Sequence, residues 1–160
     1  MEIKFLSSEI CMADRTIAIE GNEYIFLIEP GYDAIVKGKI GGSSVEAIFD
    51  FCKSINKEIR WIAFSHSHGD HVGNLPLYLK RMPTFPCVIG HVNSPIFKTL
   101  LRVSLINEHL VKKIAEECES NVLDGHKYQF LSTPGNIEKG EDLAIYLVEK
   151  KILFVGDNYQ

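Results

Sequence analysis

Three histidines and one aspartate lie within six consecutive residues of the segment IAFSHSHGDHVGNLPLYL, which spans residues 62–79. The four residues are His66, His68, Asp70 and His71. Imidazole and carboxylate groups are ligands that zinc, iron and manganese accept, and the absence of cysteine in this segment disfavours a closed structural zinc site. Ordinary turns also contain serine, glycine and aspartate, but clustered histidines beside a buried strand would lose hydration without compensation. The cluster therefore predicts an open metal site of the catalytic type.

The residues before the cluster suggest how its side chains converge. The run EIRWIAF, residues 58–64, is apolar and β-branched and predicts a strand that ends at the cluster. If the chain stays extended, His66, His68 and Asp70 leave on one side, because side chains alternate along a strand. We therefore expect His66, His68 and Asp70 to point toward a common centre.

The residues after the cluster predict a turn and then a helix. Gly69 gives the chain freedom for a sharp turn, so that His71 approaches the same centre from the first turn of a helix. The run GNLPLYLKRM, residues 73–82, continues as a helix, with Pro76 tolerated near its first turn. Four ligands then converge on one place.

The remaining segments alternate between strand and helix patterns. Predicted strands are TIAIEG (16–21) and EYIFLIEPG (23–31), which form a hairpin, then FPCVIGH (85–91), KYQFLSTPG (127–135), DLAIYLVE (142–149) and KILFVGD (151–157). Predicted helices are IGGSSVEAIFDFCKSIN (40–56) and IFKTLLRVSLINEHLVKKIAEECES (96–120), the latter as one broken or two short helices. These elements predict a sandwich of the α/β or α+β class, and the pattern alone leaves both open.

The composition is that of one globular domain covering residues 1–160. A formal charge of −4 gives no electrostatic reason to expect nucleic-acid binding or an anionic membrane surface. The cysteines are too far apart for a CxxC pair, and reduced buried thiols are expected; they are Cys11, Cys52, Cys87 and Cys118. The first residues lack a signal-peptide pattern, and no run has membrane-spanning length, so we expect a cytoplasmic protein.

The cluster and its setting resemble a known family. The sequence SHSHGDH, residues 65–71, resembles the HxHxDH signature of the metallo-β-lactamase-fold hydrolases. Four weaker matches follow in the family's order: IFLIEPG (25–31) for its early strand, CVIGH (87–91) for the strand after the motif, STPGN (132–136) for its TPGH segment, and KILFVGD (151–157) for a strand ending in Gly-Asp. The resemblance implies a four-layer αββα sandwich with metals held at one edge of its two sheets.

The resemblance also implies a ligand set. His66 and His68 would hold a first metal, Asp70 and His71 a second, and Asp157 would bridge the two. Asp70 would also orient the attacking water and take its proton. The implied cofactor is zinc, as one or two ions, with iron or manganese as alternatives.

The chain departs from the family pattern at several places. Asn136 stands where the family has a third histidine, and an amide oxygen is a weaker ligand for zinc than imidazole. Glu29 replaces an aspartate of the early strand, which leaves its orienting role open. For His91 and His126 we expect a surface role or a place beside the ligands, and His109 reads as a residue on a helix surface.

The family continues beyond the Gly-Asp strand to a last histidine ligand, whereas this sequence ends at Gln160. We therefore expect an αββα sandwich whose C-terminal part is incomplete. An incomplete sheet leaves apolar surface and an open edge, so we expect a homo-oligomer or a separate partner segment that covers them.

Two functions remain open from the sequence. One is a hydrolase in which metal-activated water attacks an ester, thioester, amide or phosphoester bond of a small-molecule substrate. The other is a degenerate or partial member that binds zinc or iron, a ligand or a protein partner without hydrolysis. The spacing of the cluster predicts metal binding in both cases.

Overall fold

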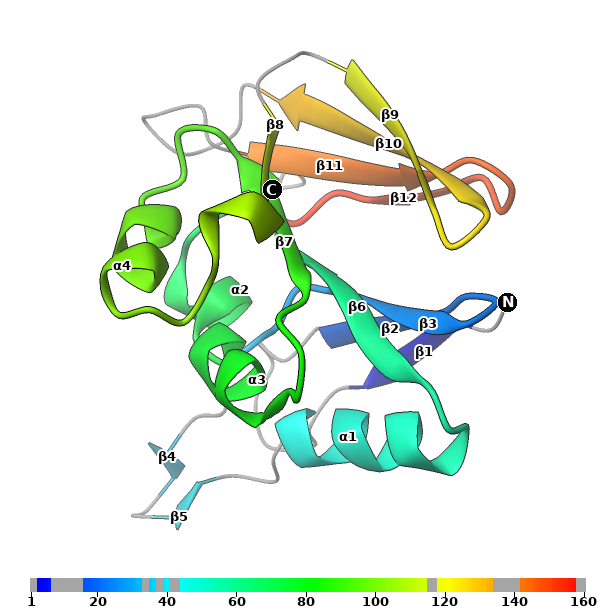
Figure 1. Ribbon diagram of the computed structural model, residues 1–160. Helices are drawn as coiled ribbons and strands as arrows, with labels where there is room; N and C mark the ends of the chain where they lie inside the picture. Colours follow the sequence, from blue (N-terminus) through cyan, green and yellow to red (C-terminus); the bar gives the residue numbers. More distant parts are fainter. Residues whose placement is uncertain are drawn as a thin grey trace.

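The computed structural model describes residues 3–6, 16–32, 35–36, 39–40, 44–114, 118–133 and 142–157. Two sheets lie face to face, and helices cover one of them on its outer side (Figure 1). A two-stranded ribbon of β4 (Ile35–Val36) and β5 (Lys39–Ile40) stands apart from both sheets.

The first sheet has six strands in the order β1-β2-β3-β6-β7-β8. They are β1 (Ile3–Leu6), β2 (Thr16–Glu20), β3 (Tyr24–Ile28), β6 (Glu58–Ala63), β7 (Cys87–His91) and β8 (Val111–Ile114). Strands β1, β2 and β3 pair antiparallel, which confirms the predicted hairpin, and β3, β6, β7 and β8 pair parallel. The carboxyl ends of the parallel strands meet at one edge, so the residues that follow β3, β6 and β7 are brought together there.

The second sheet is antiparallel, in the order β12-β11-β10-β9. Its strands are β9 (Cys118–Leu123), β10 (His126–Thr133), β11 (Asp142–Leu147) and β12 (Ile152–Phe154). The three C-terminal strands that the sequence predicts are therefore confirmed. The turn between β11 and β12 contains Lys151 at a φ of 55°.

Four short α-helices are described: α1 (Ser44–Ser54), α2 (Gly69–Val72), α3 (Leu75–Arg81) and α4 (Ile96–Arg102). Their apolar residues pack on the outer face of the first sheet. Val45, Ile48 and Cys52 lie on one face of α1, as the predicted helical spacing requires, and all three are buried. Pro76 lies in the first turn of α3, where it interrupts no helical hydrogen bond. No described helix is long and apolar enough to cross a membrane.

The first sheet has a core on each side, because its residues alternate in direction. Leu27 of β3 packs against the helices, whereas its neighbours Phe26 and Ile28 pack against the second sheet. The layer between the sheets includes Tyr128 and Phe130 of β10, both fully buried. Each such side chain contributes about 1.5–3 kcal/mol on burial, so this layer holds the two sheets together.

One element prediction is wrong. The sequence predicts one broken helix or two short helices over residues 96–120, but after α4 the chain forms a 3₁₀ turn at Glu108–Leu110 and then the strands β8 and β9. Polar residues with an approximate helical period surround Val111 and Ile114 and suggested a helix. The long-range parallel pairing of β8 with β7 decides the conformation instead. His109 accordingly lies in the 3₁₀ turn and not on an α-helix.

The predicted four-layer αββα sandwich with an incomplete C-terminal part agrees with this arrangement. The described residues provide three of the layers, namely the helices and both sheets. Within the described ranges, no helix lies on the outer face of the second sheet. Two large apolar side chains are exposed on that sheet, Val122 at 69% and Leu153 at 47%.

Candidate metal centre

The histidine cluster lies at the carboxyl edge of the first sheet, in the loop after β6 and in α2. Backbone hydrogen bonds fix this loop to both sheets. The Glu29 N–H donates to the Ala63 carbonyl at 2.9 Å, and the Leu143 N–H of β11 donates to the Ser65 carbonyl at 2.9 Å. The Gly31 N–H donates to the His71 carbonyl at 2.9 Å. The site therefore forms where the first sheet, its edge loops and the second sheet meet.

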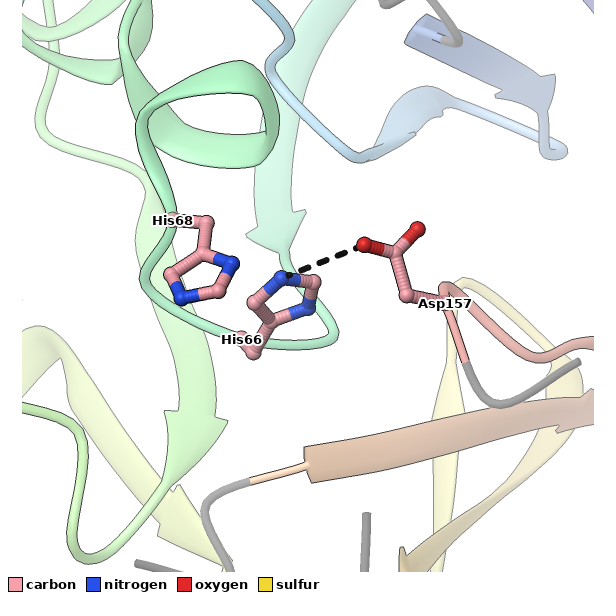
Figure 2. A group of neighbouring side chains, drawn as sticks. All are labelled: His66, His68 and Asp157. Atoms are coloured by element: carbon pink, nitrogen blue, oxygen red, sulfur yellow. Dashed lines mark ion pairs between the residues drawn. The ribbon is translucent and has the colours of Figure 1, made fainter. Parts of the chain in front are cut away.

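The five predicted ligands fall into two groups that share one residue. Ligand atoms of His66, His68 and Asp157 lie within 4.8 Å of one another, and so do ligand atoms of Asp70, His71 and Asp157. Figure 2 shows the first group: the two histidines extend from one loop, and Asp157 faces them from the end of β12. The structure thus brings together all five residues, with Asp157 in the shared position that the resemblance implies.

The state of His66 tests whether a metal fits here. Its side chain is 1% exposed, and its Nε2 has no hydrogen-bond partner among the described residues. The Asp157 carboxylate faces this nitrogen with Oδ2 at 3.8 Å, which is too long for a hydrogen bond. A buried nitrogen without a partner costs about 1–3 kcal/mol, and a cation between His66 and Asp157 would satisfy it. The residues present therefore fit a metal ion.

The second group is arranged in a similar way around His71. Its Nε2 lies 3.4 Å from Asp157 Oδ1 and 3.6 Å from Asp70 Oδ2. The carboxylates of Asp70 and Asp157 are 46% and 42% exposed, whereas the imidazole is 10% exposed. The imidazole of His71 is therefore largely shielded from water, whereas the carboxylates of Asp70 and Asp157 are open to solvent.

Glu29 fixes the orientation of His71. Its Oε2 lies 3.2 Å from His71 Nδ1, and its Oε1 accepts the Ser65 N–H at 3.2 Å. Burial alone would lower the pKa of His71, but the hydrogen bond to Glu29 and its charge outweigh this effect and raise the pKa. Glu29 is buried at a φ of 53°, a strained conformation for a residue with a side chain. The orienting role that the sequence left open is thus occupied by this glutamate.

A different set of groups faces His66 Nδ1. The Ser65 hydroxyl lies 2.9 Å from this nitrogen and 3.4 Å from His71 Nδ1. The buried carboxylate of Asp142 lies 3.6 Å from His66 Nδ1. Burial lowers the pKa of His66, and the neighbouring His71, whose ring centre is 4.0 Å away, lowers it further. Both effects favour the neutral form of the His66 imidazole, which is the form that binds metals.

Two other residues of the predicted site are Asn136 and Gly69. Asn136 lies outside the described residues, so its role as a ligand stays a prediction. Gly69 was expected to supply a sharp turn, but it begins α2 without a positive φ, and a Cβ there would meet nothing within 4 Å. The turn therefore does not depend on glycine at this position.

The other histidines take different places. His91 is 5% exposed; its Nε2 lies 3.2 Å from Ser132 Oγ, and its Nδ1 accepts the Asn93 N–H at 3.2 Å. The surface interpretation of His91 is therefore wrong, because it links β7 to β10 in the interior. His126 is the first residue of β10, directly after the predicted turn, and is only partly exposed.

Sequence reasoning missed two residues of the centre, Ser65 and Asp142. Ser65 directly precedes the first histidine and was taken as part of the motif without a role. Asp142 lies 76 residues beyond His66 at the start of a strand, and only the packing of the two sheets brings them together. The signal that was available is that Asp142 is a charged residue leading directly into an apolar strand.

No family model matches the chain. A hydroxyacylglutathione hydrolase of Xylella fastidiosa is 31% identical over 96 residues, which is 60% of this chain and 31% of that protein. The chain thus spans about a third of the length of this curated relative. A flavo di-iron protein from Thermotoga maritima superposes with a TM-score of 0.63 at 22% identity, over 88% of this chain and 31% of that protein. A metallo-β-lactamase from Pontibacter korlensis superposes with a TM-score of 0.61 at 16% identity, over 88% of this chain and 58% of that protein. Together with the HxHxDH motif and the two sheets described above, these likenesses confirm the resemblance of the sequence: the chain has the metallo-β-lactamase fold.

Proposed function

We propose that this chain carries the metal centre of a hydrolase that cleaves a small-molecule substrate with water. The observation that carries the proposal is the buried, unpaired Nε2 of His66, which faces the shared carboxylate of Asp157. Five ligands in two groups around one carboxylate suit a pair of divalent ions, with zinc as the first candidate and iron or manganese as alternatives. Bound divalent ions would lower the pKa of water toward neutrality and polarise the bond that is attacked.

The residues of the chain then have distinct tasks. His66 and His71 would offer their Nε2 atoms from the buried side of the centre, and Asp157 would belong to both ligand groups. Asp70 is the most exposed carboxylate of the set, so one of its oxygens can face the attacking water and accept its proton. Proton transfer by a positioned carboxylate typically contributes a factor of about 10²–10⁴ to the rate.

A thioester is the substrate class that we propose to test first. The support is the sequence similarity to a protein named hydroxyacylglutathione hydrolase, which extends over 60% of this chain. Esters, amides and phosphoesters are the other bonds that the same chemistry attacks. The test is hydrolysis of a hydroxyacylglutathione, a nitrophenyl phosphodiester and a nitrophenyl ester by the zinc-loaded, manganese-loaded and iron-loaded protein.

Two variants give the test its controls. His68→Ala removes an exposed ligand of the first group and should lower both metal content and turnover. Asp70→Asn keeps the shape of the side chain and removes its charge, so turnover should fall by about 10²-fold or more. If the loaded parent protein hydrolyses none of these substrates faster than the His68→Ala variant, the proposed reaction is wrong.

A second candidate is a protein that binds metal without hydrolysis, and Asn136 favours it. An amide in place of a third imidazole weakens the first metal position. Iron binding would accord with the similarity in fold to a flavo di-iron protein. Elemental analysis of the natively purified protein, with zinc and iron measured separately, is combined with the hydrolysis assays above: bound metal without turnover supports the second candidate.

A further inference from the structure

Asp142 is a buried carboxylate for which neither the motif nor the proposed reaction gives a role. It begins β11 in the second sheet, is 4% exposed, and lies with Oδ1 3.6 Å from Nδ1 of His66. The backbone holds it there, because the next residue, Leu143, donates its N–H to the Ser65 carbonyl at 2.9 Å. Buried carboxylates are compensated by hydrogen-bonded or oppositely charged groups, and the imidazole of His66 is one polar group that lies beside this one.

The Ser65 hydroxyl does not determine which ring nitrogen of His66 carries the proton. His66 can offer a lone pair at Nε2 only if its proton is on Nδ1. The Ser65 hydroxyl is 2.9 Å from Nδ1, but a hydroxyl can donate or accept, so it is compatible with a proton on either nitrogen. The same hydroxyl also lies 3.4 Å from His71 Nδ1, which leaves its direction further undetermined.

The charge of Asp142 removes this ambiguity. A carboxylate only accepts, and although 3.6 Å is too long for a hydrogen bond, its negative charge in a buried site favours the N–H of Nδ1 pointing toward it. We propose that Asp142 is a positioning residue that keeps the proton of His66 on Nδ1 and so presents Nε2 to the first metal. The inference rests on the metal centre of the proposed function.

Glu29 lies behind His71 in the same way that Asp142 lies behind His66. It lies against Nδ1 of His71 at 3.2 Å, so each metal group contains one histidine backed by a buried carboxylate. Glu29 directly follows β3 of the first sheet, and Asp142 is the first residue of β11 in the second. Carboxylates behind metal-binding histidines fix the ring and strengthen the ligand, and their loss typically weakens metal binding about 10–100-fold.

The experiment compares Asp142→Asn with a matched control, Glu119→Gln. Both changes neutralise one acid of the second sheet, but Glu119 lies in β9 and pairs with Lys112 at 2.6 Å, among partners other than the metal ligands. Zinc affinity is measured by competition with a chromogenic chelator. The protonated ring nitrogen of His66 is identified by ¹⁵N NMR of the chelator-treated protein.

We expect the parent and Glu119→Gln to carry the His66 proton on Nδ1 and to bind zinc equally. In Asp142→Asn the proton should redistribute toward Nε2, and zinc affinity should fall about 10–100-fold. Equal zinc affinity in Asp142→Asn and the parent overturns the inference. If Asp142→Asn does not fold, the NMR measurement on the parent protein tests the inference by itself. A His66 proton found on Nε2 in the parent overturns the inference.

The experiments separate failure of this inference from failure of the proposed hydrolase function. A parent that binds zinc with the expected dependence on Asp142 but hydrolyses nothing contradicts the hydrolase and supports this inference. A parent that hydrolyses a substrate, with unchanged zinc affinity in Asp142→Asn, supports the hydrolase and overturns the inference. A parent that binds no metal overturns both.

Discussion

The turn at Gly156 offers a direct test of how tightly the metal centre is packed. Gly156 immediately precedes the shared ligand Asp157 and has a φ of 55°, a region that residues with a side chain rarely adopt. A Cβ added there would lie 2.4 Å from Ser65 Oγ and 2.6 Å from Ser65 Cβ, and 3.5 Å from Glu29 Oε1. The added methyl group of Gly156→Ala would therefore overlap with Ser65 and displace the loop that carries His66 and His68.

The cost has two parts. The left-handed conformation costs a residue with a Cβ about 1–2 kcal/mol. Overlap with Ser65 in a packed site costs about 1–3 kcal/mol more, because Ser65 is buried and its N–H is held by Glu29. We expect a total of about 2–5 kcal/mol, a large part of the roughly 5–15 kcal/mol that stabilises a typical domain.

Urea unfolding and zinc titration measure the two consequences. With an unfolding slope of about 2 kcal/mol per molar urea, the midpoint should fall by roughly 1–2.5 M. Zinc affinity should fall as well, since Asp157 and the loop at Ser65 cannot both keep their places. Gly69→Ala is the matched control: a Cβ at Gly69 meets nothing within 4 Å, and stability should change by less than about 1 kcal/mol.

The reasoning is refuted if Gly156→Ala unfolds at the same urea concentration as the parent and binds zinc equally well. A result in which Gly69→Ala is the more damaging variant would also contradict it. That outcome would mean that glycine is needed within the motif and not at the end of β12.

Three further predictions address other parts of the chain. Burial raises the pKa of Cys52 to about 11, so at pH 8 only about one thiol in a thousand is ionised. An alkylating reagent should therefore modify Cys52 far more slowly than the exposed Cys118, as followed by mass spectrometry, until urea is added or the pH approaches 11. Asn136→His should tighten zinc binding if this residue faces the first metal, and an unchanged titration would place it elsewhere. Val122 and Leu153 are exposed on the second sheet, so light scattering at micromolar concentration should show an oligomer. The double variant Val122→Ser, Leu153→Ser should weaken this association, and a parent protein that stays monomeric contradicts the expectation.

The elements and ligands that could be predicted from the sequence are those whose pattern lies within one short segment. The cluster at residues 65–71 combines ligand types, a preceding apolar strand and a following helix within a short window, so its identity as a ligand cluster was accessible from spacing. The expected extended path through Asp70 is wrong, because Asp70 lies in α2 and groups with His71 and not with His66 and His68. Asp157 was accessible only through the resemblance, because its partner histidines are about 90 residues earlier. The structure places it in both ligand groups.

What escaped prediction depends on contacts between distant segments. Strand β8 has a helical pattern of polar residues and becomes a strand because its backbone pairs with β7. The contact of Asp142 with His66 requires the second sheet to pack on the first, which no local pattern specifies. The inward position of Glu29 depends on a strained φ of 53° after β3.

The metal centre and the sandwich depend on each other for the same reason. His66 and His68 belong to a loop of the first sheet, and Asp157 follows the last strand of the second, so neither sheet alone contains a complete ligand group (Figure 2). The apolar layer between the sheets therefore determines the distance from the histidines to the shared carboxylate. Four carboxylates, those of Glu29, Asp70, Asp142 and Asp157, lie within 3.8 Å of ring nitrogens of His66 or His71 at the junction of the two sheets. A cation bound between the histidines and Asp157 would contact residues of both sheets at once, so binding it would stabilise the packed sandwich as well as supply the chemistry of the site.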